Sequence, residues 1–426
     1  MLNALAGWRQ TFPPHRILWI AGLGVALSLL GDVSLYVVLP THVDEAGIVL
    51  ANVGLMLSAN RLIRIVINSP FGVFIERIPR RRMAVPALFL GAFSSLLYSI
   101  PGFWPLLIGR LLWGTAWAGL WLSASTMALD ISTHDNRGRF VGLLQMWYFI
   151  GIGISSLLGG VLTDWLSYLD TFRISFVITL IAAVGWWLFL PETQHHRAEG
   201  NHPQPAAPSA AGYIAETGYV LPLLTALLLM GVNWLIFLGI LGAVLPLLLE
   251  ERIGETVLLA GIVIPLATFT GAVTAGNQVV SLLSSPLAGW LTDRSRQRWG
   301  LILLALLTGG GAMAMIAVGG GVIVVTATML GAAATSVLQT QVMTLIGDFS
   351  SAHRRGRVLG ILNTVGDVGS AGGPLLAYAL LPVIELEGIF WLAAIVLLLS
   401  IPWTLWIARR ESAVHPVAAR GEKVGG

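Results

Sequence analysis

Apolar stretches of about 20 residues recur from one end of this chain to the other, the length that an α-helix needs to cross the hydrocarbon core of a bilayer. Only helices and closed β-barrels satisfy all backbone hydrogen bonds within a membrane. The strands of a barrel alternate between apolar and polar residues, and these stretches lack that period-2 alternation, so they predict helices. Of the 426 residues, 56% are hydrophobic and 11% are charged. The sequence therefore predicts an all-α integral membrane protein.

Hydropathy divides these stretches into two sets of six predicted helices. The predicted helices are 18–40, 47–75, 83–101, 104–129, 140–163 and 173–191, then 219–248, 257–291, 299–318, 321–346, 358–383 and 387–408. We therefore predict an N-terminal six-helix bundle over 1–191, a polar linker over 192–217, a C-terminal six-helix bundle over 218–410 and a tail over 411–426.

The basic residues predict the orientation of the chain in the membrane. Most of the 24 lysines and arginines fall on one side of the predicted layout, so both termini, the linker and the tail are expected to be cytoplasmic. The first apolar stretch is too long for the h-region of a signal peptide and has no small-residue cleavage site, so we expect it to be kept as a span.

Cysteine is absent, which excludes disulfides and thiolate metal sites. The linker histidines, His195, His196 and His202, do not have the regular spacing of metal ligands. We expect no metal and no cofactor.

Two charged segments of the first half return in the second half at nearly constant offset, which predicts an internal repeat. The first segment contains Gly72, Glu76, Arg77, Arg80 and Arg81, and its counterpart contains Gly289, Asp293 and Arg294. The second segment, with Arg137 and Arg139, returns with Arg355 and Arg357. Six-helix repeats of this kind are a transporter architecture, with the substrate site expected near the midplane between the halves.

With these motifs the chain resembles the major facilitator superfamily over essentially its whole length. It departs from the usual pattern at Glu76, where the family has Asp, and at Pro79, where the family has Gly. The resemblance implies the twelve-helix fold of that family and a cytoplasmic latch made by the repeated motif residues, whose acids lie near helix N-termini and whose arginines pair across the cytoplasmic face. The arginines can equally be topology determinants and headgroup contacts.

The helix predicted over 104–129 carries Arg110 and Gly114, which resemble the R-x-x-x-G motif of proton-coupled members. Trp113, Trp117 and Trp121 share the face of Arg110, so we expect them to line a substrate cavity. The alternatives are core packing for Trp113 and an interfacial position for Trp121. Asn233 and Gln339 are further cavity candidates, although intramembrane amides often only join helices.

Five ionisable residues fall within the predicted spans: Asp32, Arg61, Arg64, Arg110 and Asp367. The resemblance implies that helices 1 and 4 both line the cavity, so we expect an ion pair between Asp32 and Arg110 inside the first half. The resemblance makes helices 2 and 11 neighbours, as it does helices 5 and 8, so Arg61 or Arg64 can pair with Asp367. Protonation of Asp32 or Asp367 would then switch the conformational state. The alternatives are a fixed polar contact that only joins helices or, for Arg64, a side chain that extends to the membrane interface.

The predicted function is secondary transport of a small organic solute by alternating access, coupled to protons, in the direction of efflux for an amphipathic or drug-like compound. Ser155 and Ser156 stand where the antiporter motif of the family has Gly-Pro, which weakens the inference of antiport. An organic anion or anionic lipid is the alternative cargo, since arginines outnumber aspartates in the spans. A receptor-like protein that does not transport is a further alternative, and no constellation of an enzyme active site stands in the spans.

The expected partners are the small-molecule substrate, protons and the lipid bilayer, without nucleic acid. We expect a monomer in the plasma (inner) membrane.

Overall fold

The structure is a computed structural model, and it describes residues 12–132, 136–193, 217–259, 261–295, 298–349 and 355–414. The linker histidines and nearly all of the predicted linker and tail lie outside these ranges, so the predictions made for them are not tested.

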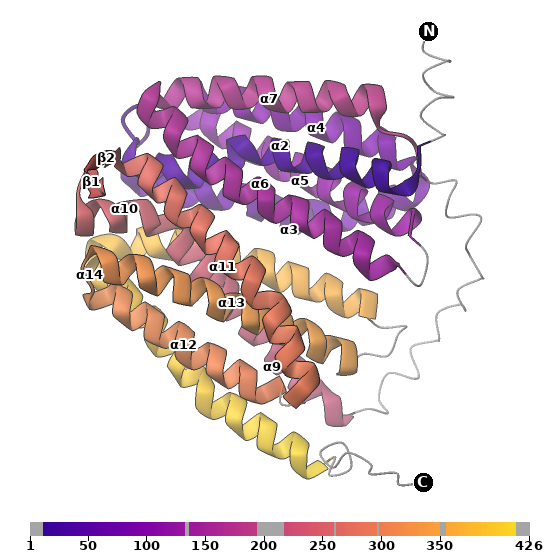
Figure 1. The fold of residues 1–426 in the computed structure, drawn as a ribbon, viewed down its shortest axis with the longest axis vertical. Helices are drawn as coiled ribbons and strands as arrows, with labels where there is room; N and C mark the ends of the chain where they lie inside the picture. The colour runs from indigo at the N-terminus through magenta and orange to yellow at the C-terminus, as the bar shows by residue number, and fades with distance from the viewer. Residues whose placement is uncertain are drawn as a thin grey trace. The chain divides into compact units, whose positions relative to one another are not determined.

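Helices account for nearly all of the described N-terminal segment (Figure 1). They are α2 (Pro14–Val38), α3 (Leu50–Arg77), α4 (Arg80–Tyr98), α5 (Phe103–Asp130), α6 (Arg137–Trp165) and α7 (Tyr168–Phe189), with a short 3₁₀ turn at Leu39–Thr41. Helix α2 packs against α6 and α7, α4 packs against α5 and α7, and α3 packs against α5. Large apolar side chains cover the outside as well as the core, as at Ile181 and Trp187 on α7, which is the pattern expected of helices that face lipid.

The C-terminal segment continues with helices and one β-hairpin (Figure 1). Its elements are α9 (Thr217–Asn233), a π-helical segment (Trp234–Leu241), α10 (Gly242–Ile253), β1 (Thr256–Leu259), β2 (Ile262–Pro265), α11 (Leu266–Ser295), α12 (Arg298–Val318), α13 (Gly321–Phe349) and α14 (Arg355–Val414). The break that hydropathy predicts between 383 and 387 lies within α14 at Glu385, whose φ of 56° interrupts the helical backbone.

The helix predicted over 257–291 is wrong in its first nine residues, because α11 begins only at Leu266. The preceding residues form the antiparallel hairpin β1–β2, in which Thr256 is opposite Pro265 and Leu259 is opposite Ile262. Gly261 has a φ of 83°, and the segment is rich in β-branched residues, which favour strands. Hydropathy did not separate the two structures because the hairpin is as apolar as the helix that follows.

Eight helical segments in the described residues are long and apolar enough to cross a membrane. These segments run from Pro14–Thr41 at one end of the described chain to Ile361–Glu411 at the other. They confirm an α-helical membrane protein. The count of twelve spans and the cytoplasmic location of the termini stay predictions.

The described residues divide into two compact units. The first unit combines the N-terminal segment with Gly239–Val279 and Ala371–Ala379, while the second contains the remaining described parts of the C-terminal segment. In the second unit α13 packs against α12 and α9. Hydrogen bonds join α11 to α13 there, and one of them runs from the Thr292 hydroxyl to the side-chain oxygen of Gln341 at 2.8 Å.

Two helix contacts attach the parts of the first unit to each other. The Ser58 hydroxyl on α3 donates to the carbonyl of Ala371 on α14 at 2.6 Å, which makes these helices neighbours, as the resemblance implied. Helix α6 meets α11 backbone to backbone, because a side chain at Gly160 would lie 2.1 Å from the Ala267 carbonyl oxygen. Close approach of this kind requires small residues at the contact.

Candidate functional site

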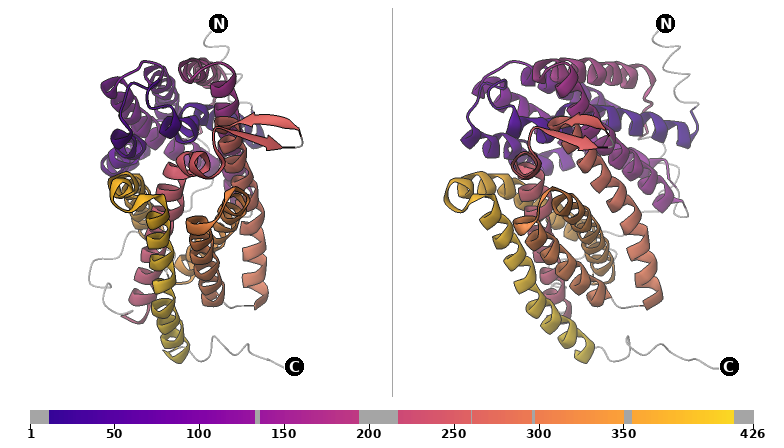
Figure 2. Two further views of the ribbon diagram at one scale, coloured as in Figure 1. Left: turned by 90° about the vertical axis from the view of Figure 1, so that its left-hand side faces the viewer. Right: turned by 60° about the vertical axis from the view of Figure 1, so that its left-hand side comes forward.

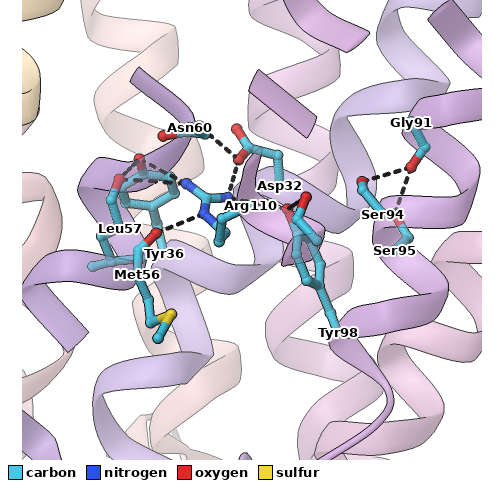
Figure 3. A network of polar contacts seen from close by, with 11 residues as sticks. Asp32, Tyr36, Met56, Leu57, Asn60, Gly91, Ser94, Ser95, Tyr98 and Arg110 are labelled. Carbon is cyan, nitrogen blue, oxygen red and sulfur yellow. Dashed lines mark hydrogen bonds and ion pairs between the residues drawn. The ribbon is translucent and has the colours of Figure 1, made fainter. Parts of the chain in front are cut away.

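Arg110 is the centre of a polar network inside the first unit (Figure 3). It lies on α5, one turn before Gly114, and its side chain is fully buried. A Cβ at position 114 would lie 2.2 Å from the carbonyl oxygen of Asn60, so only glycine lets α5 approach α3 this closely. The glycine of the R-x-x-x-G pattern thereby brings the arginine within reach of the α3 backbone.

The guanidinium of Arg110 has acceptors on several helices. Its Nε donates to the Met56 carbonyl at 2.7 Å, its Nη1 donates to the carboxylate of Asp32, and its Nη2 donates to the Tyr36 hydroxyl at 3.2 Å. Longer contacts of 3.4 Å reach the Leu57 carbonyl and the Tyr98 hydroxyl. Charge-assisted bonds to several acceptors compensate a cation that has lost its water, which explains how it can be buried.

Asp32 completes the ion pair that the sequence predicted with Arg110. Its side chain is 14% exposed, whereas that of Arg110 is 0% exposed. The same Oδ1 that contacts Arg110 also accepts from Nδ2 of Asn60 at 3.2 Å. The ion pair is therefore confirmed, and its role in proton coupling stays a prediction.

Tyr36 connects this ion pair to a second arginine. Its ring lies 5.4 Å from the Arg110 guanidinium and 5.1 Å from the guanidinium of Arg61, both within cation–π range. Its hydroxyl donates to the Leu57 carbonyl at 2.7 Å. Sequence analysis missed Tyr36, although it follows Asp32 by four residues and so lies on the same helix face.

An aromatic row extends from Arg110 along α5. Trp113 is buried with its ring against Gly91 of α4, as expected of core packing. The rings of Trp117 and Trp121 stack at 5.5 Å, and Tyr148 of α6 lies 5.7 Å from the first and 5.2 Å from the second. Trp121 and Tyr148 are half-buried. The predicted role of the three tryptophans in a cavity stays a prediction.

The other predicted site residues lie on different elements. Arg64 is half-buried on α3, and Asp367 is buried on α14 in the second unit. Asn233 donates from Nδ2 to the Thr335 hydroxyl at 2.6 Å and so joins α9 to α13, while Gln339 is half-buried on α13. The pairing of Arg61 or Arg64 with Asp367 stays a prediction.

Two of the predicted latch residues take part in a second polar cluster inside the first unit. Arg80 is buried, and its Nε lies 3.1 Å from Oδ2 of Asp130, at the end of α5. The carboxylate of Glu192 accepts from the backbone N–H groups of Arg80 and Arg81, both at 3.0 Å. Glu192 thereby caps the first turn of α4, whose own preceding residue supplies no side-chain cap.

Sequence analysis did not predict a role for Asp130, and it placed Glu192 in the linker. The available signal was an acid directly after a predicted span, close to where a neighbouring helix begins. That signal could not indicate which helix is capped, because Glu192 lies more than 100 residues after Arg80, where that helix begins.

Replacing Glu192 with glutamine is expected to destabilise the protein by about 1 kcal/mol, since an amide offers a single acceptor oxygen to two backbone donors. The midpoint of thermal denaturation in detergent measures the change. Glu251→Gln is the matched control. Glu251 is exposed, and its ion pair with the adjacent Arg252, at 3.5 Å, is of the exposed kind that contributes little to stability. Equal midpoints for the two variants would show that the cap contributes nothing.

Four of the remaining latch residues have side-chain positions that the structure describes, namely Gly72, Gly289, Arg139 and Arg294. Gly72 and Gly289 have open space where a Cβ would lie. Arg139 is exposed, and Arg294 lies over the ring of Trp290 at 5.8 Å. The side chains of the other latch residues lie outside the described part of the chain, namely Glu76, Arg77, Arg137, Asp293, Arg355 and Arg357. The latch therefore stays a prediction.

Comparison with known proteins agrees with the fold. The chain is 25% identical to the multidrug resistance protein MdtG of Escherichia fergusonii over 407 residues, which cover 94% of this chain and 96% of MdtG. It is 26% identical to the inner membrane transport protein YajR of Escherichia coli, in an alignment covering 42% of this chain and only 38% of YajR.

Among solved structures, a bacterial homologue of the human lysosomal transporter Spinster superposes with a TM-score of 0.70 at 15% identity, covering 95% of this chain and 97% of the homologue. Residues 21–276 and 267–424 match the sequence pattern of the Major Facilitator Superfamily. Because these matches span nearly the whole chain, this protein belongs to the Major Facilitator Superfamily and is a membrane transporter of that family.

Proposed function

We propose that the protein is a proton-coupled secondary transporter that exports an amphipathic or drug-like compound by alternating access. The observation that carries the proposal is the buried ion pair of Asp32 and Arg110. A carboxylate held by a buried guanidinium is costly to leave unpaired, so gain or loss of a proton at Asp32 changes the stability of the arrangement around Arg110.

The surroundings of the pair support an amphipathic cargo. Trp117, Trp121 and Tyr148 offer flat apolar surfaces with polar edges. The similarity to MdtG over nearly the whole chain supports efflux of drug-like compounds. We propose that the transporter's termini are cytoplasmic, because its basic residues are concentrated on one predicted side. We also propose that it is a monomer of the plasma (inner) membrane.

Transport into vesicles tests this function. Purified protein in liposomes should accumulate a lipophilic dye when a pH gradient is imposed, and collapse of the gradient by an ionophore should abolish the accumulation. A thermal-shift screen identifies ligands for the assay, since a bound compound stabilises the folded state by mass action. Accumulation that persists after the gradient has collapsed would contradict proton coupling.

An organic anion is the second candidate cargo, and Arg61 favours it. Its guanidinium is buried beside Tyr36, so a second cation lies next to the Asp32–Arg110 pair. If Arg61 binds the cargo, Arg61→Gln should remove the thermal shifts given by anionic ligands and leave those of neutral ligands unchanged. An unchanged response to anionic ligands would exclude this role.

A further inference from the structure

The hairpin β1–β2 has an apolar tip that no helix of the described structure covers. Figure 2 shows the two strands extending away from the helices that they connect. At the tip, Leu258 is 72% exposed, Leu259 is 59%, Ile262 is 66% and Val263 is 61%. Large apolar side chains gathered at one exposed place mark a surface that contacts either another molecule or a membrane.

The tip is apolar on both of its faces. Successive side chains of a strand point to opposite faces, so Leu258 and Leu259 lie on different faces, as do Ile262 and Val263. No charged residue occurs between Glu255, at the base of the hairpin, and Asp293, near the end of α11. Lipid can surround such a tip on both faces, whereas a protein partner packed against one face would leave the other apolar face uncovered.

Contacts at the base of the hairpin give its depth relative to α6. The N–H of Leu266 donates to the carbonyl of Glu255 at 2.9 Å, which closes the base where α11 begins. Two residues later the N–H of Thr268 donates to the carboxylate of Asp164 at 2.6 Å. The next residue on α6, Trp165, is 79% exposed. Exposed tryptophans at the ends of spans favour the boundary between membrane and water, so the base of the hairpin lies at that boundary.

The backbone of the hairpin limits how deep it can go. A two-stranded sheet has two open edges, whose N–H and C=O groups need water or headgroups, so the hairpin does not belong in the hydrocarbon core. An isolated hairpin with strands of this length is also marginal in water. The headgroup layer satisfies both requirements, since it solvates the backbone edges and takes up apolar side chains.

We propose that the hairpin β1–β2 is a lipid anchor, with its tip inserted into the headgroup region of the leaflet beside α6 and α11. The anchor would hold the first turn of α11, where Asp164 contacts Thr268, at a constant depth. The proposal requires the chain to lie in a bilayer and is independent of its cargo and of proton coupling.

Spin labels on single cysteines test the proposal without removing any native thiol, because the chain has no cysteine. The labelled variants are Leu258→Cys and Ile262→Cys at the tip. Asp44→Cys, at an exposed position in the turn that precedes α3, is the aqueous control, and Val279→Cys, at an exposed apolar position of α11, is the lipid control. Each is reconstituted in liposomes of phosphatidylethanolamine and phosphatidylglycerol. Collision rates with oxygen, which concentrates in lipid, and with a polar nickel chelate, which stays in water, are then compared.

We expect the oxygen-to-nickel ratio at both tip positions to be several-fold above that at Asp44→Cys and to lie between the two controls. Tip ratios equal to that of Asp44→Cys would place the hairpin in water and overturn the proposal. Dipolar broadening between labels that persists when the protein is diluted in lipid would also overturn it, since the tip would then be covered by a second copy of the chain. Correct folding of each variant is confirmed by its elution as a single peak in size-exclusion chromatography.

Discussion

Arg110→Gln is expected to destabilise the protein by about 3 to 5 kcal/mol and to abolish transport, because it leaves the Asp32 carboxylate in the bundle without its cation. Glutamine is also too short and has too few donors to contact Met56 and Tyr36 together with Asp32. Unfolding of the detergent-solubilised protein by a denaturant titration measures the loss of stability. Transport is measured in vesicles.

Arg173→Gln is the matched control for this substitution. Arg173 pairs with Asp170 three residues earlier, but its side chain is 60% exposed. Exposed pairs contribute little, so this variant should stay within about 0.5 kcal/mol of the unmodified protein. A double variant, Arg110→Gln with Asp32→Asn, should recover part of the stability, since it removes the uncompensated charge. Similar losses for Arg110→Gln and Arg173→Gln would show that the buried pair is not structurally important.

Asp32→Asn has the second largest expected effect, a loss of transport driven by a pH gradient. The asparagine side chain carries no proton that can be exchanged at physiological pH, yet it retains an oxygen that can accept from Arg110 and Asn60. The variant should therefore still bind the cargo. It should also still exchange cargo between the inside and the outside of the vesicles when no pH gradient is present. This separation between driven transport and exchange distinguishes a proton carrier from a residue that only maintains the fold.

Two further variants are compared with Asp32→Asn, namely Asp367→Asn and Asp170→Asn. Asp367 is the other intramembrane carboxylate, and Asp170 lies exposed in the first turn of α7, where its loss should change transport little. If Asp32→Asn and Asp367→Asn both keep full gradient-driven accumulation, neither carboxylate carries the proton. If only Asp367→Asn loses gradient-driven accumulation, the proton is carried on α14, and the Asp32–Arg110 pair is a fixed ion pair that only joins helices.

Properties that depend on neighbours along the chain could be predicted from the sequence. The length and hydropathy of an apolar stretch decide whether a helix can cross a bilayer, so helices such as α5 and α12 were located to within a few residues. The repeated motif at a constant offset indicated the family before any contact was known. The pairing of Asp32 with Arg110 was also predicted, because the resemblance implied that the helices carrying these two residues both line the cavity.

Features that depend on contacts between distant parts of the chain could not be predicted from hydropathy or residue spacing. The segment Thr256–Pro265 is as apolar as a span, and only its hydrogen bonding makes it a hairpin. Glu192 caps α4, and Asp164 contacts the first turn of α11, across more than 100 residues in each case. A side chain at the end of one helix finds its acceptor or donor only when packing brings another helix end beside it. The sequence thus determined a membrane protein of this family with its buried charges, and the packing decided which backbone groups those charges satisfy.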